Sequence, residues 1–271
     1  MSTATSRESF RKEVTDYWEK HGRHPLPWRH TDDAYRILVS EVMLQQTQVP
    51  RVTLKYAEFL KKFPTVHALA KARLADVLKV WSGLGYNRRG KYLHDAAKAI
   101  VREHKGKVPR EYTALRKLSG VGDYTARAVR VFAFNEPDVL IETNIRAAYI
   151  HHYFGAHKKV TDAEILPLAE EAAKGQDPRE WHWALMDYGS FVKKLHQNPT
   201  RLSAHYVVQM KFEGSLRQVR GAILKLLTQG PRGDLALAHE LSYDAKKVRE
   251  ALSGLKRDGL VVPARGSWRI A

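Results

Sequence analysis

Residues 118–146, LSGVGDYTARAVRVFAFNEPDVLIETNIR, contain a glycine turn between two helical patterns, followed by a carboxylate. Gly120 and Gly122 let the backbone turn tightly and leave N–H groups uncovered at a helix N-terminus, an arrangement that can hold a phosphate. Residues 125–134 are small and apolar enough to form a buried helix, and Glu142 comes eight residues later. The stretch therefore predicts that the hairpin binds a nucleic-acid phosphate and that Glu142 is positioned near the bound strand. A simple helix–helix turn with a solvated glutamate is the alternative.

The charge balance indicates a polyanionic partner. The 271 residues include 46 Lys and Arg against 29 Asp and Glu, a net charge of +17. This excess is more than solubility requires and favours nucleic acid. An anionic membrane surface is the competing partner, but no strongly amphipathic cationic helix lies at either terminus. No apolar run approaches a transmembrane length, and the N-terminus lacks a signal-peptide core. We therefore expect a cytoplasmic protein without membrane association.

The chain has no cysteine. Disulfides, thiolate zinc sites and cysteine-ligated iron–sulfur clusters are thereby excluded. His151 and His152 are adjacent, so they point in different directions on a helix, and no carboxylate lies at chelating spacing. We expect no metal site and no cofactor. The one possibility left open is a monovalent cation bound at the hairpin.

Helical patterns fill the chain on both sides of the hairpin. Before it, we expect helices at residues 6–21, 35–49, 52–63, 66–70, 74–81 and 92–104, with a tight turn at 83–86. After Glu142, helices continue through residue 153 and recur at 162–174 and 180–195. Nothing before residue 213 predicts a sheet. The helix at 35–49 is unusual, because it carries Glu41 and three glutamines among apolar residues.

The last part of the chain has a different character. Helices are predicted at residues 216–228, 236–241 and 244–258, and a two-stranded ribbon at 261–270 turns at Arg265-Gly266. This order is typical of a winged helix. Its longest helix carries Lys246 and Lys247 among other cations, which favours a second DNA contact through that helix and the ribbon. The alternative is a solvated basic face on a protein–protein module.

Four motifs carry a family resemblance. The hairpin at residues 118–126 resembles the helix-hairpin-helix of the DNA glycosylase superfamily that includes endonuclease III, with Ser119 where proline is usual. Residues 40–49, SEVMLQQTQV, closely resemble the signature of MutY-type adenine DNA glycosylases. The stretches WSGLGY (81–86) and ALMDYG (184–189) match as well.

The resemblance covers about residues 6–195. It implies an all-α, two-lobed HhH-GPD glycosylase domain at residues 1–212, with the active site between the lobes. We expect a winged-helix domain with a small β-hairpin at residues 213–271.

The chemistry explains the need for two carboxylates. Cleaving a purine N-glycosidic bond requires protonation of the base and stabilisation of an oxocarbenium-like sugar. Glu41 is the expected general acid, because burial in an apolar helix favours the acid form; an ion-paired helix carboxylate is the alternative. Glu142 is expected to stay ionised and to stabilise or capture the cation. Bifunctional relatives carry a Schiff-base lysine at the position of Tyr124, so Tyr124 predicts base removal without efficient strand cleavage.

The resemblance also implies how DNA is bound. The target base must leave the stack, and Gln46 and Tyr86 are expected to wedge into the duplex, Tyr86 beside the opposing base. The expected base pocket consists of Trp28, Arg29, Leu44 and Asp187, with Arg29 and Asp187 as donor and acceptor for a purine edge. Ordinary structural roles are the alternative for these residues. Further DNA contacts are expected at Arg88, Arg89, Gly120, Gly122 and Thr125.

Three departures from the family pattern affect the prediction. Glu142 stands where Asp is usual, and its extra methylene moves the carboxylate by about one C–C bond, a misplacement that can cost roughly 100-fold in rate. Residues 193–206 stand where the family has a four-cysteine cluster loop, so packing and basic contacts must hold this segment. A winged helix stands where the family has its 8-oxoguanine-reading domain.

The expected function is base excision repair of double-stranded DNA carrying a mispaired or damaged base. The favoured reaction is monofunctional removal of adenine opposite guanine or 8-oxoguanine, by a monomeric, nucleoid-associated protein. One alternative is a thymine or uracil mismatch glycosylase acting opposite guanine, because related enzymes of that kind also carry Tyr at position 124. Another is a non-catalytic, structure-specific DNA-binding protein.

Overall fold

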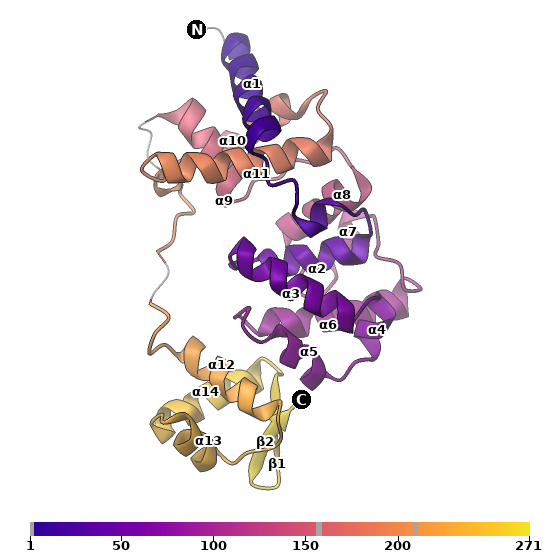
Figure 1. Cartoon of the computed structure of the whole chain (residues 1–271), viewed down its shortest axis with the longest axis vertical. Helices are drawn as coiled ribbons and strands as arrows, with labels where there is room; N and C mark the ends of the chain where they lie inside the picture. Colours follow the sequence, from indigo (N-terminus) through magenta and orange to yellow (C-terminus); the bar gives the residue numbers. More distant parts are fainter. Residues whose placement is uncertain (1–2, 156–158, 209–210) are drawn as a thin grey trace. The chain divides into compact units, whose positions relative to one another are not determined.

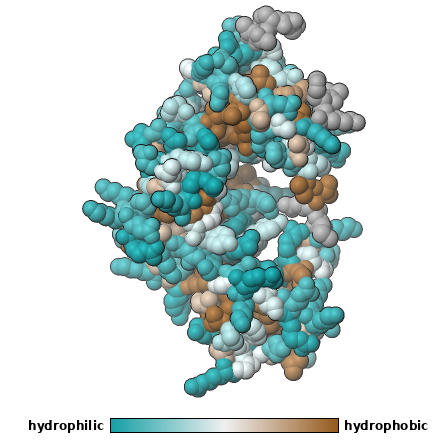
Figure 2. All heavy atoms as spheres, turned by 180° about the vertical axis from the view of Figure 1, so that it is seen from behind, coloured by the Kyte–Doolittle hydropathy of each residue, from teal (hydrophilic) through white to brown (hydrophobic). Residues whose placement is uncertain are grey.

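The computed structural model describes residues 3–155, 159–208 and 211–271, and for residues 3–5 the backbone alone (Figure 1). In these ranges the helices and strands comprise many helices and one two-stranded antiparallel sheet, so the predicted all-α class is confirmed. No helix in the described ranges combines the length and apolarity needed to cross a membrane. Hydrophilic residues predominate on the face shown in Figure 2.

Backbone contacts divide the chain into two compact units. The first contains residues 1–37, 110–112 and 122–208, and the second contains residues 38–109, 113–121 and 209–271. The predicted boundary between residues 212 and 213 is not this division, because the C-terminal helices group with residues 38–109. That boundary remains a prediction.

The first unit is built around helix α11 (Pro178–Leu195), which packs against α9 (Thr143–Tyr149) and α1 (Thr3–His21). The contact with α9 is close: a Cβ on Gly189 would lie 1.9 Å from the carbonyl oxygen of Asn144. The other elements of this unit are η1 (Pro27–Arg29), α8 (Asp123–Phe134), the π-helical turn η2 (Ile150–Phe154), α10 (Asp162–Ala173) and the 3-10 helix η3 (Pro199–Leu202).

The second unit has α6 (Arg88–Glu103) as its central helix, with α4 (Val66–Lys71) and α5 (Leu74–Trp81) packed against it. Trp81 is fully buried there. Helix α3 (Val49–Lys62) contacts α5. Helices α2 (Ala34–Leu44) and α7 (Tyr112–Arg116) each begin in the first unit and continue into the second.

Three predicted helix boundaries near the glutamine-rich motif were wrong, one of them because α3 begins at Val49 rather than at residue 52. The helix expected at residues 35–49 ends at Leu44, and Gln46 adopts a left-handed backbone with φ of 54°. Pro50 explains the break, since its ring would clash with the carbonyl of Gln46 in a continuous helix. Helix α6 begins at Arg88 rather than at residue 92, so Arg88 and Arg89 lie in its first turn.

The C-terminal segment forms the predicted winged helix. Its helices are α12 (Leu216–Leu227), α13 (Asp234–Leu241) and α14 (Ala245–Arg257). Strands β1 (Val261–Ala264) and β2 (Ser267–Ile270) pair with Val261 opposite Ile270. The turn at Arg265-Gly266 is confirmed, with both residues at positive φ.

The winged helix shares a hydrophobic core with the rest of the second unit. Leu74 and Leu78 of α5 belong to the same buried cluster as Ile223, Leu252 and Leu255. Removing the winged helix would expose the two leucines of α5 to water. It is therefore an integral part of this unit rather than a tethered module.

Candidate active site and nucleic-acid interface

Glu41 lies in the last part of α2 and is 6% exposed. Its neighbours Val42 and Met43 are 2% and 0% exposed. The side chain of Glu41 is therefore buried within the protein. The general-acid role itself stays a prediction.

Glu142 lies at the start of a helix. It is the N-cap of α9, where its Oε1 accepts hydrogen bonds from the backbone N–H of Asn144 at 2.7 Å and of Ile145 at 2.9 Å. These donors and the positive end of the helix stabilise negative charge on the carboxylate. The side chain of Lys193 donates to Asn144 Oδ1 at 3.2 Å, which holds a further positive charge nearby. The helix start thus anchors this carboxylate, despite the extra methylene relative to Asp.

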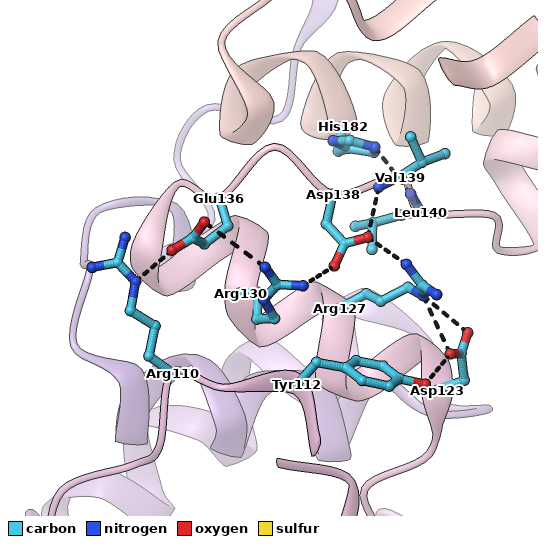
Figure 3. A network of polar contacts seen from close by, with 10 residues as sticks. All are labelled: Arg110, Tyr112, Asp123, Arg127, Arg130, Glu136, Asp138, Val139, Leu140 and His182. Atoms are coloured by element: carbon cyan, nitrogen blue, oxygen red, sulfur yellow. Dashed lines mark hydrogen bonds and ion pairs between the residues drawn. The ribbon is translucent and has the colours of Figure 1, made fainter. Parts of the chain in front are cut away.

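A network of charged side chains holds the segment that leads to Glu142 (Figure 3). Asp138 is 8% exposed and accepts hydrogen bonds from Arg127 and, at 2.7 Å, from Arg130. The same carboxylate accepts from the backbone N–H of Val139 at 3.0 Å. Two arginines of α8 therefore fix the backbone four residues before Glu142.

His182 of α11 braces the same segment. Its Nε2 accepts a hydrogen bond from the backbone N–H of Leu140 at 3.1 Å (Figure 3). Its Nδ1 donates to the carbonyl of Pro178 at 2.6 Å. Burial lowers the pKa of His182 to about 4, so the ring is neutral near pH 7. This neutral tautomer is the form that can accept from Leu140.

The hairpin has the predicted backbone geometry. Gly120 has φ of 76° and is exposed, and Gly122 is the exposed N-cap of α8. Tyr124 is half-buried in the first turn of that helix. Thr125 is only 3% exposed, so its side chain is buried, and its predicted contact with DNA stays a prediction. The prediction also missed Asp123, whose carboxylate places negative charge in this first turn and accepts from the hydroxyl of Tyr112 at 2.6 Å.

Arg29 and Asp187, which were predicted to bind a purine edge, form an ion pair with each other. Arg29 donates to both carboxylate oxygens of Asp187, at 2.8 and 3.0 Å, and the side chains are 4% and 2% exposed. Burial opposes the ionisation of Asp187, but the hydrogen bonds from Arg29 outweigh it and lower the Asp187 pKa. The predicted donor and acceptor are therefore used to join η1 to α11. Trp28 of η1 is also buried, at 5%, while Leu44 is half-buried at the end of α2 in the second unit.

Arg89 of α6 donates hydrogen bonds to backbone carbonyls of the protein. Its guanidinium is buried and donates to the carbonyls of Val42, Met43 and Leu84, at 2.9, 3.0 and 3.0 Å. Burial lowers the Arg89 pKa to about 10. Arg89 therefore satisfies carbonyls at the C-terminus of α2 and in the adjoining turn, and its predicted contact with DNA stays a prediction.

The predicted wedge residues lie at exposed, left-handed positions. Tyr86 has φ of 44° and is 40% exposed, and Gln46 is also exposed. Such backbone angles are uncommon for residues other than glycine. Both residues line one cleft of about 690 Å³, together with Arg88 and Gly120. Arg89 also lines this cleft, so the structure brings together five residues predicted to bind DNA.

The two predicted lysines of the winged helix lie in the first turn of α14. Lys246 is exposed. Lys247 Nζ donates to the carbonyl of Gly214 at 2.6 Å, so its ammonium group has an acceptor within the protein. Their predicted contact with DNA stays a prediction.

The segment at residues 193–206 is held without cysteines. The backbone N–H of Val160 donates to the carbonyl of Leu202 at 2.8 Å, and the N–H of Ala204 donates to Val160 at 2.9 Å. Pro199 and Thr200 of η3 are buried. Backbone pairing and packing therefore replace metal ligation here. Across the described part of the chain, no three His, Asp or Glu side chains form a group suited to a metal ion.

Comparison with known proteins places this site in a family. Residues 39–173 match the model of the HhH-GPD superfamily base excision DNA repair protein. The chain is 35% identical to the adenine DNA glycosylase of Mycolicibacterium smegmatis, over 90% of each chain. It is 44% identical to that of Mycobacterium tuberculosis, over 90% of this chain and 88% of that one. This chain belongs to the HhH-GPD superfamily of base excision DNA repair proteins. The family predicted from the motifs is confirmed.

Solved structures agree with this assignment. A thermostable thymine-DNA glycosylase matches with a TM-score of 0.63 and 28% identity, over 70% of this chain and 88% of that one. Endonuclease III in a non-covalent DNA complex matches with a TM-score of 0.57 and 20% identity, over 72% and 88%. The second likeness concerns the fold alone.

Proposed function

We propose that this HhH-GPD protein is a monofunctional glycosylase that removes adenine mispaired with guanine or 8-oxoguanine in double-stranded DNA. The observation that carries the proposal is the similarity to adenine DNA glycosylases along nine tenths of both chains. The burial of Glu41 within the matching glutamine-rich motif supports the same conclusion. The net charge of +17 suits a DNA substrate.

In the proposed reaction, Glu41 donates a proton to the leaving adenine. The C1′–N9 bond breaks and its electron pair goes to the base, leaving positive charge on the sugar. Glu142, held as a carboxylate at the start of α9, stabilises that charge. Water then adds to C1′ and returns its proton to Glu41, which restores the acid.

Tyr124 supports a reaction without strand cleavage. A lyase step requires an amine that forms a Schiff base with the sugar, and the phenol of Tyr124 has none. The product is then an intact strand with an abasic site, which breaks only on treatment with hot alkali.

A second candidate reaction is the removal of thymine or uracil opposite guanine. The 28% identity to the solved thymine-DNA glycosylase favours it. The closed pair of Arg29 and Asp187 also favours it, because neither side chain is open to a purine edge in this conformation. The family resemblance at residues 40–49 favours adenine.

Single-turnover excision on four duplexes tests the proposal. The duplexes carry A opposite 8-oxoguanine, A opposite G, T opposite G and U opposite G, and each is analysed with and without hot alkali. We expect adenine loss that appears as strand breaks only after alkali. Loss of thymine or uracil alone would establish the second reaction. Binding without excision from any duplex would overturn both and establish a non-catalytic DNA-binding protein.

A further inference from the structure

A cleft of about 690 Å³ joins the winged helix to the glycosylase helices within the second unit. Tyr86, Arg88 and Gly120 line one side of it, and the winged-helix residues Arg217, Arg220 and Arg257 line the other. The winged-helix side consists of α12 and the C-terminal turn of α14. Lys246 and Lys247, at the opposite end of α14, do not line this cleft.

The two walls are fixed relative to each other. Asp258, the residue that ends α14, pairs with Arg220 of α12 and, at 3.4 Å, with Arg88 of α6. Its side chain is 15% exposed. The core shared with Leu74 and Leu78 lies in the same unit. The cleft is therefore a built feature rather than a gap between loosely attached parts.

Arg217 connects the walls a second time. Its Nη1 donates to the hydroxyl of Tyr86 at 2.6 Å, and its guanidinium lies 5.6 Å from the centre of the Tyr86 ring. Tyr86 remains 40% exposed in this arrangement. The cleft thus presents an aromatic ring next to an arginine of the winged helix.

The lining is strongly cationic. Among the described residues around the cleft, Asp258 is the one carboxylate, and it is paired with Arg88 and Arg220. Arg217 and Arg257 add two further positive charges. Arginines beside an exposed aromatic ring are typical of sites that bind a nucleic-acid strand. The guanidinium groups contact phosphates, and the ring stacks on a base.

We propose that this cleft binds a stretch of one DNA strand, with Arg217 and Arg257 contacting its phosphates and Tyr86 stacking on a base. The winged helix then contributes to DNA binding through α12 and the C-terminal end of α14, instead of through the lysines at the start of α14. The inference rests on the proposed function only in that its ligand is DNA.

A pair of matched double variants of the full chain tests this. Arg217→Gln with Arg257→Gln removes two charges from the cleft, and the amide at position 217 keeps a donor for the Tyr86 hydroxyl. Lys246→Gln with Lys247→Gln removes two charges from the other end of α14. Point substitutions are used because deleting the winged helix would uncover Leu74 and Leu78.

Binding is measured by fluorescence anisotropy on a duplex with a tetrahydrofuran abasic analogue opposite guanine, across a series of salt concentrations. The probe cannot be cleaved, so the result does not depend on excision. Equal melting temperatures of the variants and the parent chain show that the fold is kept. Failure of the proposed adenine reaction is therefore distinguishable from failure of this inference.

We expect the arginine pair to reduce the slope of log K against log salt by about 2, since each phosphate contact contributes about 0.9. The affinity of the arginine double variant for the duplex should fall by at least about tenfold, as expected for losing charge-assisted hydrogen bonds. The lysine pair should leave the slope within the error of the parent chain. A slope change for the arginine pair no larger than that for the lysine pair would overturn the inference.

Discussion

Glu41 and Glu142 have opposite surroundings, although they are the same residue type. Glu41 is buried within α2, whereas Glu142 is half-buried at the start of α9 and accepts two backbone hydrogen bonds. An apolar interior disfavours charge, and a helix N-terminus stabilises it. The two carboxyl groups therefore differ in burial and in hydrogen-bond donors, and the proposed reaction gives proton donation to Glu41 and charge stabilisation to Glu142.

The same substitution at both positions is the strongest test of this contrast. Glu41→Gln removes the transferable proton, so single-turnover excision on the A:8-oxoguanine duplex should fall about 10²- to 10⁴-fold. Glu142→Gln keeps an oxygen for the N–H groups of Asn144 and Ile145 but loses the charge, and excision should fall about 10²- to 10³-fold. Both variants should bind the tetrahydrofuran duplex like the parent chain. Excision retained by Glu41→Gln would eliminate the general-acid role.

Gly189→Ala disturbs the surroundings of Glu142 from a distance. The added methyl group would lie 1.9 Å from the carbonyl oxygen of Asn144, so α9 and its N-cap must move. Overpacking against backbone should lower the free energy of unfolding by about 3 kcal/mol, measured by urea denaturation. The control is Gly221→Ala in α12, where nothing lies within 4 Å of the new methyl group. That helical site should gain about 0.5–1 kcal/mol; equal effects at both glycines would contradict the packing argument.

The smallest expected effect is the contribution of His182 to the pH dependence of the free energy of unfolding. Its folded-state pKa of about 4 lies below the ordinary value of 6.5, so the unfolded chain binds more protons between these pH values. The parent chain should therefore lose about 1 kcal/mol of unfolding free energy from this group between pH 6.5 and 5.5, because the unfolded histidine is already half protonated at pH 6.5. His182→Gln, whose amide oxygen can accept from Leu140, should remove this part of the pH dependence. The exposed His239→Gln is the control, and a parent-like pH dependence in His182→Gln would refute the assignment.

Local patterns determined much of the fold in advance. The hairpin glycines, the helices around them and the Arg265-Gly266 turn could be predicted because each depends on residues within a few positions along the chain. Pro50 carries a signal of the same kind, and weighing it would have ended the helix before Gln46. The family was likewise readable from residues 40–49.

The partners of long side chains were decided by the tertiary structure alone. Arg29 and Arg89 look alike in the sequence, yet one binds Asp187, 158 residues away, and the other binds Val42, 47 residues away. Arg217 reaches Tyr86 across 131 residues, and no local pattern predicts that contact. A guanidinium can donate to a phosphate, a carboxylate or a carbonyl, so its chemistry alone does not name its partner. Only the folding of distant segments determines which acceptor lies within its reach.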